Sequence, residues 1–114
     1  MIEITIRDYL SSILNVPVLL EKPKEVHTEY VLMELLDQGE INKIGAVTFD
    51  FTSQANTLYN AKVLSERVRH ALESIVELDN ISSAKFGGAR YRISNKTYKH
   101  IITFNFYYYR EEII

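Results

Sequence analysis

The chain has 114 residues, of which 46% are hydrophobic and 25% charged, and its net charge is −2. These values are typical of one globular domain, here residues 1–114, and exclude a low-complexity or disordered chain. The absence of cysteine excludes disulfides, thiol catalysis and cysteine-based zinc sites, and neither a membrane span nor a signal peptide is expected from the apolar pattern.

The first predicted element is an amphipathic helix over residues 2–14. Apolar side chains from Ile6 to Leu14 recur at the spacing i, i+3, i+4, i+7 and i+8, which is typical of a helix with one buried face. Pro17 prevents the helix from continuing. Residues 18–21 then predict a short strand, and the proline before it favours a position at the edge of the sheet.

Two strands joined by a polar turn are predicted next. Residues 29–37 are apolar on both faces of the strand, which requires a helix on each face or a second subunit on one of them. Gln38, Gly39 and Glu40 predict the turn. Residues 44–52 alternate between apolar and polar side chains, so we expect a strand with one buried face.

The longest periodic segment without proline or glycine is residues 55–78, and it predicts one long helix. Ser53 can cap it, and its neighbours Gln54 and Asn56 are also available as caps. Some 20 residues of helix span about 30 Å, enough to cross a small sheet. We therefore interpret this helix as the scaffold of the fold and expect function on the strands and loops around it. Its apolar stripe comprises Leu58, Ala61, Leu64, Val68, Leu72 and Ile75.

The C-terminal part predicts two further strands. Residues 81–86 form a short strand, Gly87 and Gly88 follow as a turn, and a polar loop, part of which can be extended, runs to Lys96. Residues 98–109 alternate again and predict the last strand. The order α-β-β-β-α-β-β predicts an α+β fold, in which a twisted, mostly antiparallel sheet of four or five strands carries two packed helices.

Charge is distributed unevenly along the chain. Residues 81–110 contain six basic and no acidic residues, whereas the remainder contains seven basic and fifteen acidic residues. This polarity predicts patches of opposite sign on the folded surface, unless the charges average out in three dimensions.

Cations in the basic region alternate with aromatic side chains, a pattern that suits a subunit interface or a nucleic-acid surface. The acidic pI, near 5.9, favours the interface, because a nucleic-acid-binding domain is usually basic. The candidate interface residues are Lys85, Arg90, Tyr91, Arg92, Lys96, Tyr98, Lys99, Asn105, Tyr107 and Tyr109.

No pattern of catalytic or metal-binding residues is present. His27, His70 and His100 are scattered without the spacing of metal ligands, and we expect a solvated or capping role for them. The pair of glycines lacks the spacing of a phosphate-binding loop, and no serine lies in the sequence context of a hydrolase nucleophile. We therefore expect no metal, no cofactor and no enzymatic activity.

A diffuse set of short segments runs through most of the chain. These segments are Val16-Pro17-Val18 with Glu21 and Pro23, Tyr30-Val31-Leu32, Asn42-Lys43, Ser53, Thr57-Leu58-Tyr59 with Ala61, Ile81-Ser82-Ser83 and Phe106-Tyr107-Tyr108. Together with the order of the predicted elements, they resemble the small tail terminator and tail completion proteins encoded among the head–tail genes of long-tailed bacteriophages and prophages.

The resemblance implies a hexameric ring that caps the growing tail tube, stops its polymerisation and presents a surface to the filled head, without catalysis or a cofactor. The expected partners are further copies of this chain, the tail tube protein and the head–tail connector proteins. We expect no membrane partner, and direct contact with nucleic acid is not favoured. The expected location is the tail or neck of the virion, and the host cytoplasm during assembly.

Two alternative functions stay open. The first is a neck, head-closure or minor capsid protein on the head side of the same joint. The second is a small nucleic-acid-binding protein that uses the basic residues of the stretch 90–100.

Overall fold

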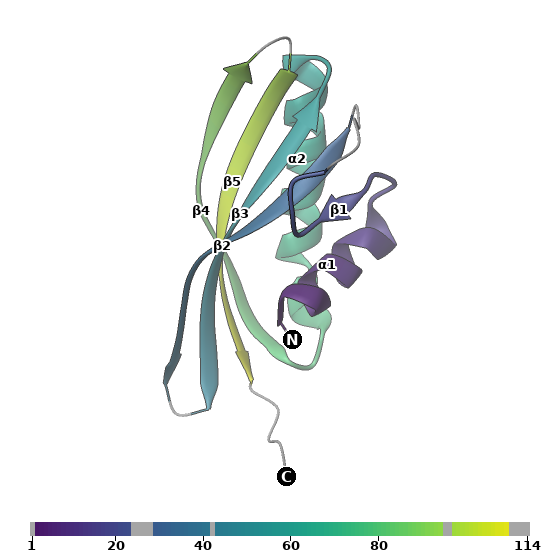
Figure 1. The fold of residues 1–114 in the computed structure, drawn as a ribbon. Helices are drawn as coiled ribbons and strands as arrows, with labels where there is room; N and C mark the ends of the chain where they lie inside the picture. Colours follow the sequence, from purple (N-terminus) through teal and green to yellow (C-terminus); the bar gives the residue numbers. More distant parts are fainter. Residues whose placement is uncertain (1, 24–28, 42, 95–96, 110–114) are drawn as a thin grey trace.

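The computed structural model describes residues 2–23, 29–41, 43–94 and 97–109 (Figure 1). The chain has the predicted α+β fold and the predicted order of helices and strands. The elements are α1 (Ile2–Ile13), β1 (Val18–Leu19), β2 (Tyr30–Ile41), β3 (Ile44–Ala55), α2 (Leu58–Glu73), the 3-10 turn η1 (Ile75–Glu77), β4 (Ile81–Ser94) and β5 (Thr97–Tyr109).

The five strands form one sheet in the order β1-β2-β3-β5-β4. Only β1 is parallel to its neighbour, and it pairs with β2 at just two positions, Val31 and Leu32. All other pairs are antiparallel. As predicted, the short strand after Pro17 lies at an edge of the sheet. The opposite edge is β4, which pairs with β5 over almost its whole length.

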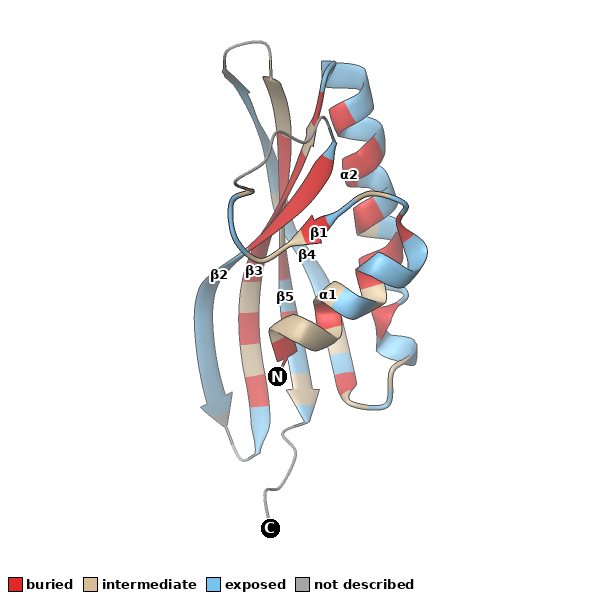
Figure 2. Cartoon of the chain, turned by 45° about the vertical axis from the view of Figure 1, so that its right-hand side comes forward, coloured by how far each residue is buried: buried red, intermediate tan, exposed pale blue. Residues whose placement is uncertain are grey.

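Both helices pack on the same face of the sheet, and the core lies between them and the strands (Figure 2). Phe51 of β3 is the centre of an aromatic group in which its ring meets Phe104 and Phe106 edge to face, at 6.5 and 6.1 Å between ring centroids. Full burial of a large apolar side chain contributes about 1.5–3 kcal/mol. The helices add Ile2, Ile6, Leu10, Leu64, Val68, Ala71 and Leu72 to this core.

The long helix is shorter at both ends than the predicted residues 55–78. It begins at Leu58, because β3 continues to pair with β5 as far as Ala55. The cap is Thr57, whose Oγ1 accepts a hydrogen bond from the Asn60 amide at 3.0 Å. Ser53 is therefore not the cap but a fully buried residue of β3. Leu58 is exposed, whereas the rest of the predicted stripe is buried.

Two predicted turns are wrong because pairing of the strands continues through them. Gln38, Gly39 and Glu40 belong to β2 and pair with the first residues of β3. Gly87 and Gly88 lie inside β4, at a β-bulge where the register shifts between Phe86 and Gly88. Residues of the predicted polar loop thus extend β4, and the backbone groups of these residues gain hydrogen-bond partners in β5.

The bulge requires glycine at position 88, and this can be tested. Gly88 has a φ of +136°, which L side chains rarely adopt, although an added Cβ would meet no atom within 4 Å. Gly39 is a matched control, because an added Cβ would also meet no atom within 4 Å there, and its φ is not one that L side chains rarely adopt. We expect Gly88→Ala to lower the free energy of unfolding by about 1 kcal/mol or more, and Gly39→Ala to leave it unchanged or slightly raised. Urea unfolding of both variants measures these free energies. Equal stabilities of the two variants would contradict the requirement for glycine at the bulge.

Candidate assembly surface

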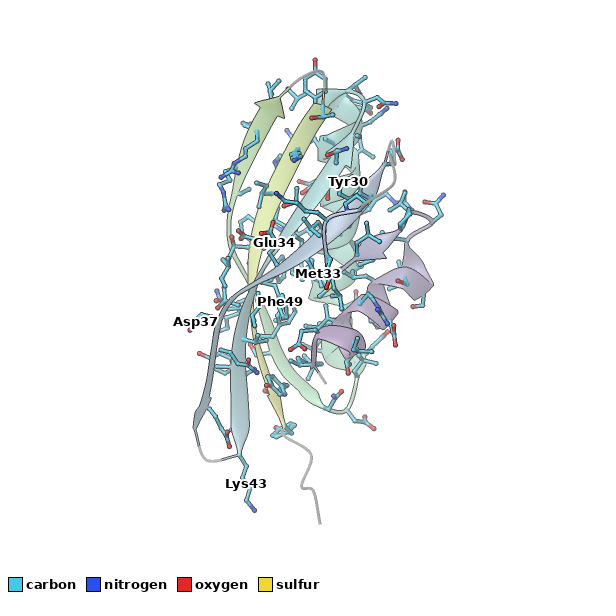
Figure 3. All side chains as sticks on the ribbon, in the orientation of Figure 1. Tyr30, Met33, Glu34, Asp37, Lys43 and Phe49 are labelled. Carbon is cyan, nitrogen blue, oxygen red and sulfur yellow. The ribbon has the colours of Figure 1, made fainter. Side chains whose placement is uncertain are left out.

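In the described part of the chain, the second face of the sheet carries no helix, and this helix-free face is the candidate functional site. Residues directly opposite one another on neighbouring strands share a face. Met33 and Phe49 lie on the helix side (Figure 3), so the residues that alternate with them, such as Glu34 and Asp50, point to the helix-free face.

Most of the predicted interface residues come together on the helix-free face, although they were predicted from a loop and a strand. By register these are Lys85, Arg90, Arg92, Lys99, Asn105, Tyr107 and Tyr109. Tyr91 and Tyr98 instead lie on the helix side, where the Tyr91 ring meets the His100 ring at 5.2 Å between centroids. Lys96 lies outside the described residues.

A buried carboxylate organises the middle of the helix-free face. The side chain of Asp50 is only 7% exposed, and its Oδ2 accepts a hydrogen bond from Arg90 Nη2 at 2.6 Å. Its other oxygen accepts from Thr103 Oγ1, also at 2.6 Å. Both carboxylate oxygens are therefore satisfied, which a buried charge requires. Asp50 joins β3 to β5 and to β4 across the sheet.

Charge on the helix-free face changes sign from one edge of the sheet to the other. β2 contains three acidic and no basic residues, and Glu34 and Asp37 are exposed. β4 contains three basic and no acidic residues, and Lys85, Arg90 and Arg92 are exposed. The uneven charge of the sequence thus does not average out in three dimensions, and the two edges have opposite sign.

A hollow of about 330 Å³ opens on this face above Asp50. It holds charges of both signs, since Glu34 and Asp50 line it together with four cations. These cations are Lys22, Arg90, Arg92 and Lys99. Their number suits an anion, but Arg90 is already paired with Asp50.

Farther along the strands, the helix-free face becomes apolar and aromatic. Ile44 pairs with Tyr109, and Ala46 pairs with Tyr107. Tyr107 is 46% and Tyr109 54% exposed, and Ile44 is also exposed. Beside them, Thr48 Oγ1 donates to Asn105 Oδ1 at 2.6 Å. Exposed tyrosine is typical of surfaces that become interfaces, because its ring buries area while its hydroxyl stays hydrogen-bonded.

A second exposed apolar surface lies on the helices. The end of α1 and the outer side of α2 enclose an open groove of about 610 Å³ with mostly apolar walls. Ile13, Tyr59 and Val63 contribute exposed side chains to it. The sequence pattern did not indicate this groove, because its residues lie on the two predicted helices and no function was expected there.

Of the two histidines that the structure describes, only His100 has a distinctive environment. It is buried, not solvated as predicted, and its Nδ1 lies 2.6 Å from Ser65 Oγ of α2. Burial lowers the pKa of His100 below its ordinary value, the charge of Glu66 opposes this shift, and Lys62 reinforces it. His100 therefore joins β5 to α2 as a neutral core residue. His70 is exposed on α2, and His27 lies outside the described residues.

The acidic partners of the basic residues were missed by sequence reasoning. Asp50 was assigned to the polar side of its strand, but it is 40 residues from Arg90, and no local spacing links the two. Thr103, the other hydrogen-bond partner of Asp50, is 53 residues from it and was missed for the same reason. The alternation of the strand was the available signal, since it placed Asp50 on the face opposite the phenylalanines.

Searches against models of protein families and against curated proteins found no match for this chain. Among the described residues, no group of three or more histidine or acidic side chains could hold a metal ion. No helix in the described part of the chain is long and apolar enough to cross a membrane. Functional inference therefore depends on the geometry of the surface and on the resemblance of the sequence.

The role of Asp50 predicts a specific loss of stability. Arg90→Ala removes the charged partner of a carboxylate that is nearly inaccessible to water, whereas Arg90 itself is half exposed. We expect the free energy of unfolding to fall by about 1–3 kcal/mol. Arg92→Ala, on the same strand and face, is the control and should change it by less than about 0.5 kcal/mol. Urea unfolding of dilute protein measures both, and equal losses would contradict the assigned role of Asp50.

Proposed function

We propose that this chain is a non-enzymatic assembly protein of a long-tailed phage, a tail terminator or tail completion protein that forms a ring at the head-proximal end of the tail tube. The observation that carries this proposal is the helix-free face, with opposite charge on its two edges. The resemblance of the sequence supplies the class of protein, and the ring could be a hexamer.

The opposite charge of the edges supports ring formation. A ring built from identical subunits needs two different, complementary patches on each of them, because every contact is head to tail. The acidic residues of β2 and the basic residues of β4 are such patches, and they lie at opposite sides of the subunit. A surface of this kind also disfavours two-fold dimers, in which like charges would meet.

The aromatic part of the helix-free face supports binding to the tail tube protein. We define the tyrosine patch as Ile44, Ala46, Tyr107 and Tyr109, which are adjacent on β3 and β5. Tyrosine is enriched among the hot spots of protein interfaces, whose truncation costs about 2 kcal/mol or more. The terminator would hold the end of the tube through this patch and so block the addition of the next tube subunit.

Capping of a growing tube tests the proposal. The purified protein, added to polymerising tail tube protein from the same genome, should shorten the tubes seen by electron microscopy and bind to their ends. Replacing both Tyr107 and Tyr109 by Ser should weaken this binding at least about tenfold. Tyr59→Ser is the matched control, because Tyr59 is 75% exposed but lies on α2, and it should bind like the parent.

Three results would contradict the proposal or a part of it. A protein that stays monomeric at all concentrations and does not bind tube protein is not a terminator. Loss of binding in Tyr59→Ser, with binding retained in the double tyrosine variant, would assign the contact to the helix groove instead. Binding to head–tail connector proteins in a pull-down, without binding to tube protein, would favour a neck or head-closure protein.

The hollow above Asp50 favours one alternative function, binding of nucleic acid. Its cations Lys22, Arg92 and Lys99 could contact phosphates. This alternative predicts salt-sensitive DNA binding that is lost when Arg92 and Lys99 become Ala. Absence of DNA binding at low salt removes it. Glu34 and Asp50 line the same hollow and disfavour an anion there.

A further inference from the structure

We propose that copies of this chain join by continuing the sheet, with β4 of one copy pairing antiparallel with the segment of β2 from Met33 to Ile41 in the next copy. This inference rests on the proposed function only for the ring, which is the assembly that such a contact would build.

Both strands are available for pairing in the described part of the chain. β1 covers β2 only at Val31 and Leu32, so the edge of β2 beyond these residues has no neighbouring strand there. Residues 34–40 of this part of β2 are exposed, as Figure 2 shows. β4 is the last strand on the other side of the sheet. Edge strands present unpaired backbone N–H and C=O groups, which are a template for another strand.

Strand direction favours an antiparallel contact. β2, β3, β5 and β4 each run antiparallel to their neighbours, so β4 runs opposite to β2 within one subunit. A head-to-tail arrangement that keeps the direction of the sheet places β4 beside β2 of the next copy in the same antiparallel pattern. The pattern of the sheet then continues across the subunit boundary.

The register within the subunit predicts which residues would meet. One row across the sheet runs Asp37, Thr48, Asn105, Lys85, and the next on the helix side runs Leu35, Phe49, Phe104, Phe86. If these rows continue into the next copy, Lys85 lies opposite Asp37, and Phe86 lies opposite Leu35.

Both predicted pairs are chemically matched. Lys85 and Asp37 carry opposite charge, and Phe86 and Leu35 are both exposed apolar side chains. Opposite charges and aromatic–aliphatic pairs stabilise directly facing positions of a sheet, whereas like charges destabilise them. A shift of the register by one residue would separate both pairs, because every side chain would change face.

Pairing with β1 limits this register at one end. Met33 would face Ala89, but the next row would place Arg90 at Leu32, where β1 already occupies the edge of β2. The contact therefore ends at Met33, and Arg90 keeps its hydrogen bond to Asp50 of its own copy. The edge of β4 would meet only acidic charges on β2, and the edge of β2 only basic charges on β4.

Cysteine cross-linking tests the contact directly, because the natural chain has no cysteine. A variant with both Asp37→Cys and Lys85→Cys should give, on mild oxidation of concentrated protein, a ladder of covalent multimers that ends at the ring size. Facing Cα atoms of an antiparallel pair are about 4.5–5.5 Å apart, within the range that a disulfide spans. A variant with Asp37→Cys and Arg92→Cys is the control, because Arg92 lies about 20 Å farther along β4, and it should give no ladder.

Charge reversal gives a second readout that does not depend on oxidation. Asp37→Lys alone and Lys85→Glu alone should each weaken self-association at least about tenfold, measured by sedimentation at low salt. The chain with both substitutions should regain it, since the charges are complementary again. Equal association of all four proteins would overturn the proposal.

The cross-linking outcomes separate this inference from the proposed function. No ladder from Asp37→Cys with Lys85→Cys, an equal ladder from the control, or self-linking of Asp37→Cys alone would overturn edge pairing. If the ladder forms but the protein neither binds nor caps the tail tube, edge pairing stands and the proposed function fails. If the protein caps the tube and no ladder forms there, the proposed function stands and edge pairing fails.

Discussion

The arrangement of the whole chain depends on one constraint, namely that both helices pack on the same face of the sheet around Phe51 and its aromatic neighbours. That packing buries most of the helix side of β3 and β5. It leaves the other side of the sheet without a helix in the described part of the chain. The uncovered side needs another source of stability, and Asp50 supplies part of it by binding Arg90 and Thr103 across three strands. The same geometry leaves the tyrosine patch and two strand edges accessible for contacts with other molecules.

Much of the fold follows from local patterns in the sequence. The alternation around Phe49 and Phe51, and again around Phe104 and Phe106, correctly predicts two core strands and their inner faces. The spacing of Leu64, Val68 and Leu72 correctly predicts the helix that covers these two strands. The order of elements and the mostly antiparallel sheet follow from these units.

The errors arise where long-range pairing overrides local signals. Gly39, Gly87 and Gly88 favour turns locally, but each lies within a strand, because pairing with β3 or β5 satisfies more backbone hydrogen bonds than a turn would. Serine is a favoured residue at a helix N-cap, but Ser53 is not the cap, because β3 extends past it to Ala55. The candidate surface was predicted only on its basic side, since the contact of Asp50 with Arg90 depends on a fold that places β3 near β4.

The central claim is that the helices are scaffold and that the strand edges and helix-free face carry assembly. Hydrogen–deuterium exchange of the backbone amides, compared between dilute and assembled protein, tests it most directly. We predict slower exchange on assembly in β4 and in residues 33–41 of β2, with α2 unchanged. Slower exchange along α2 around Tyr59 and Val63, with β4 and β2 unchanged, would contradict the claim and assign assembly to the helix groove.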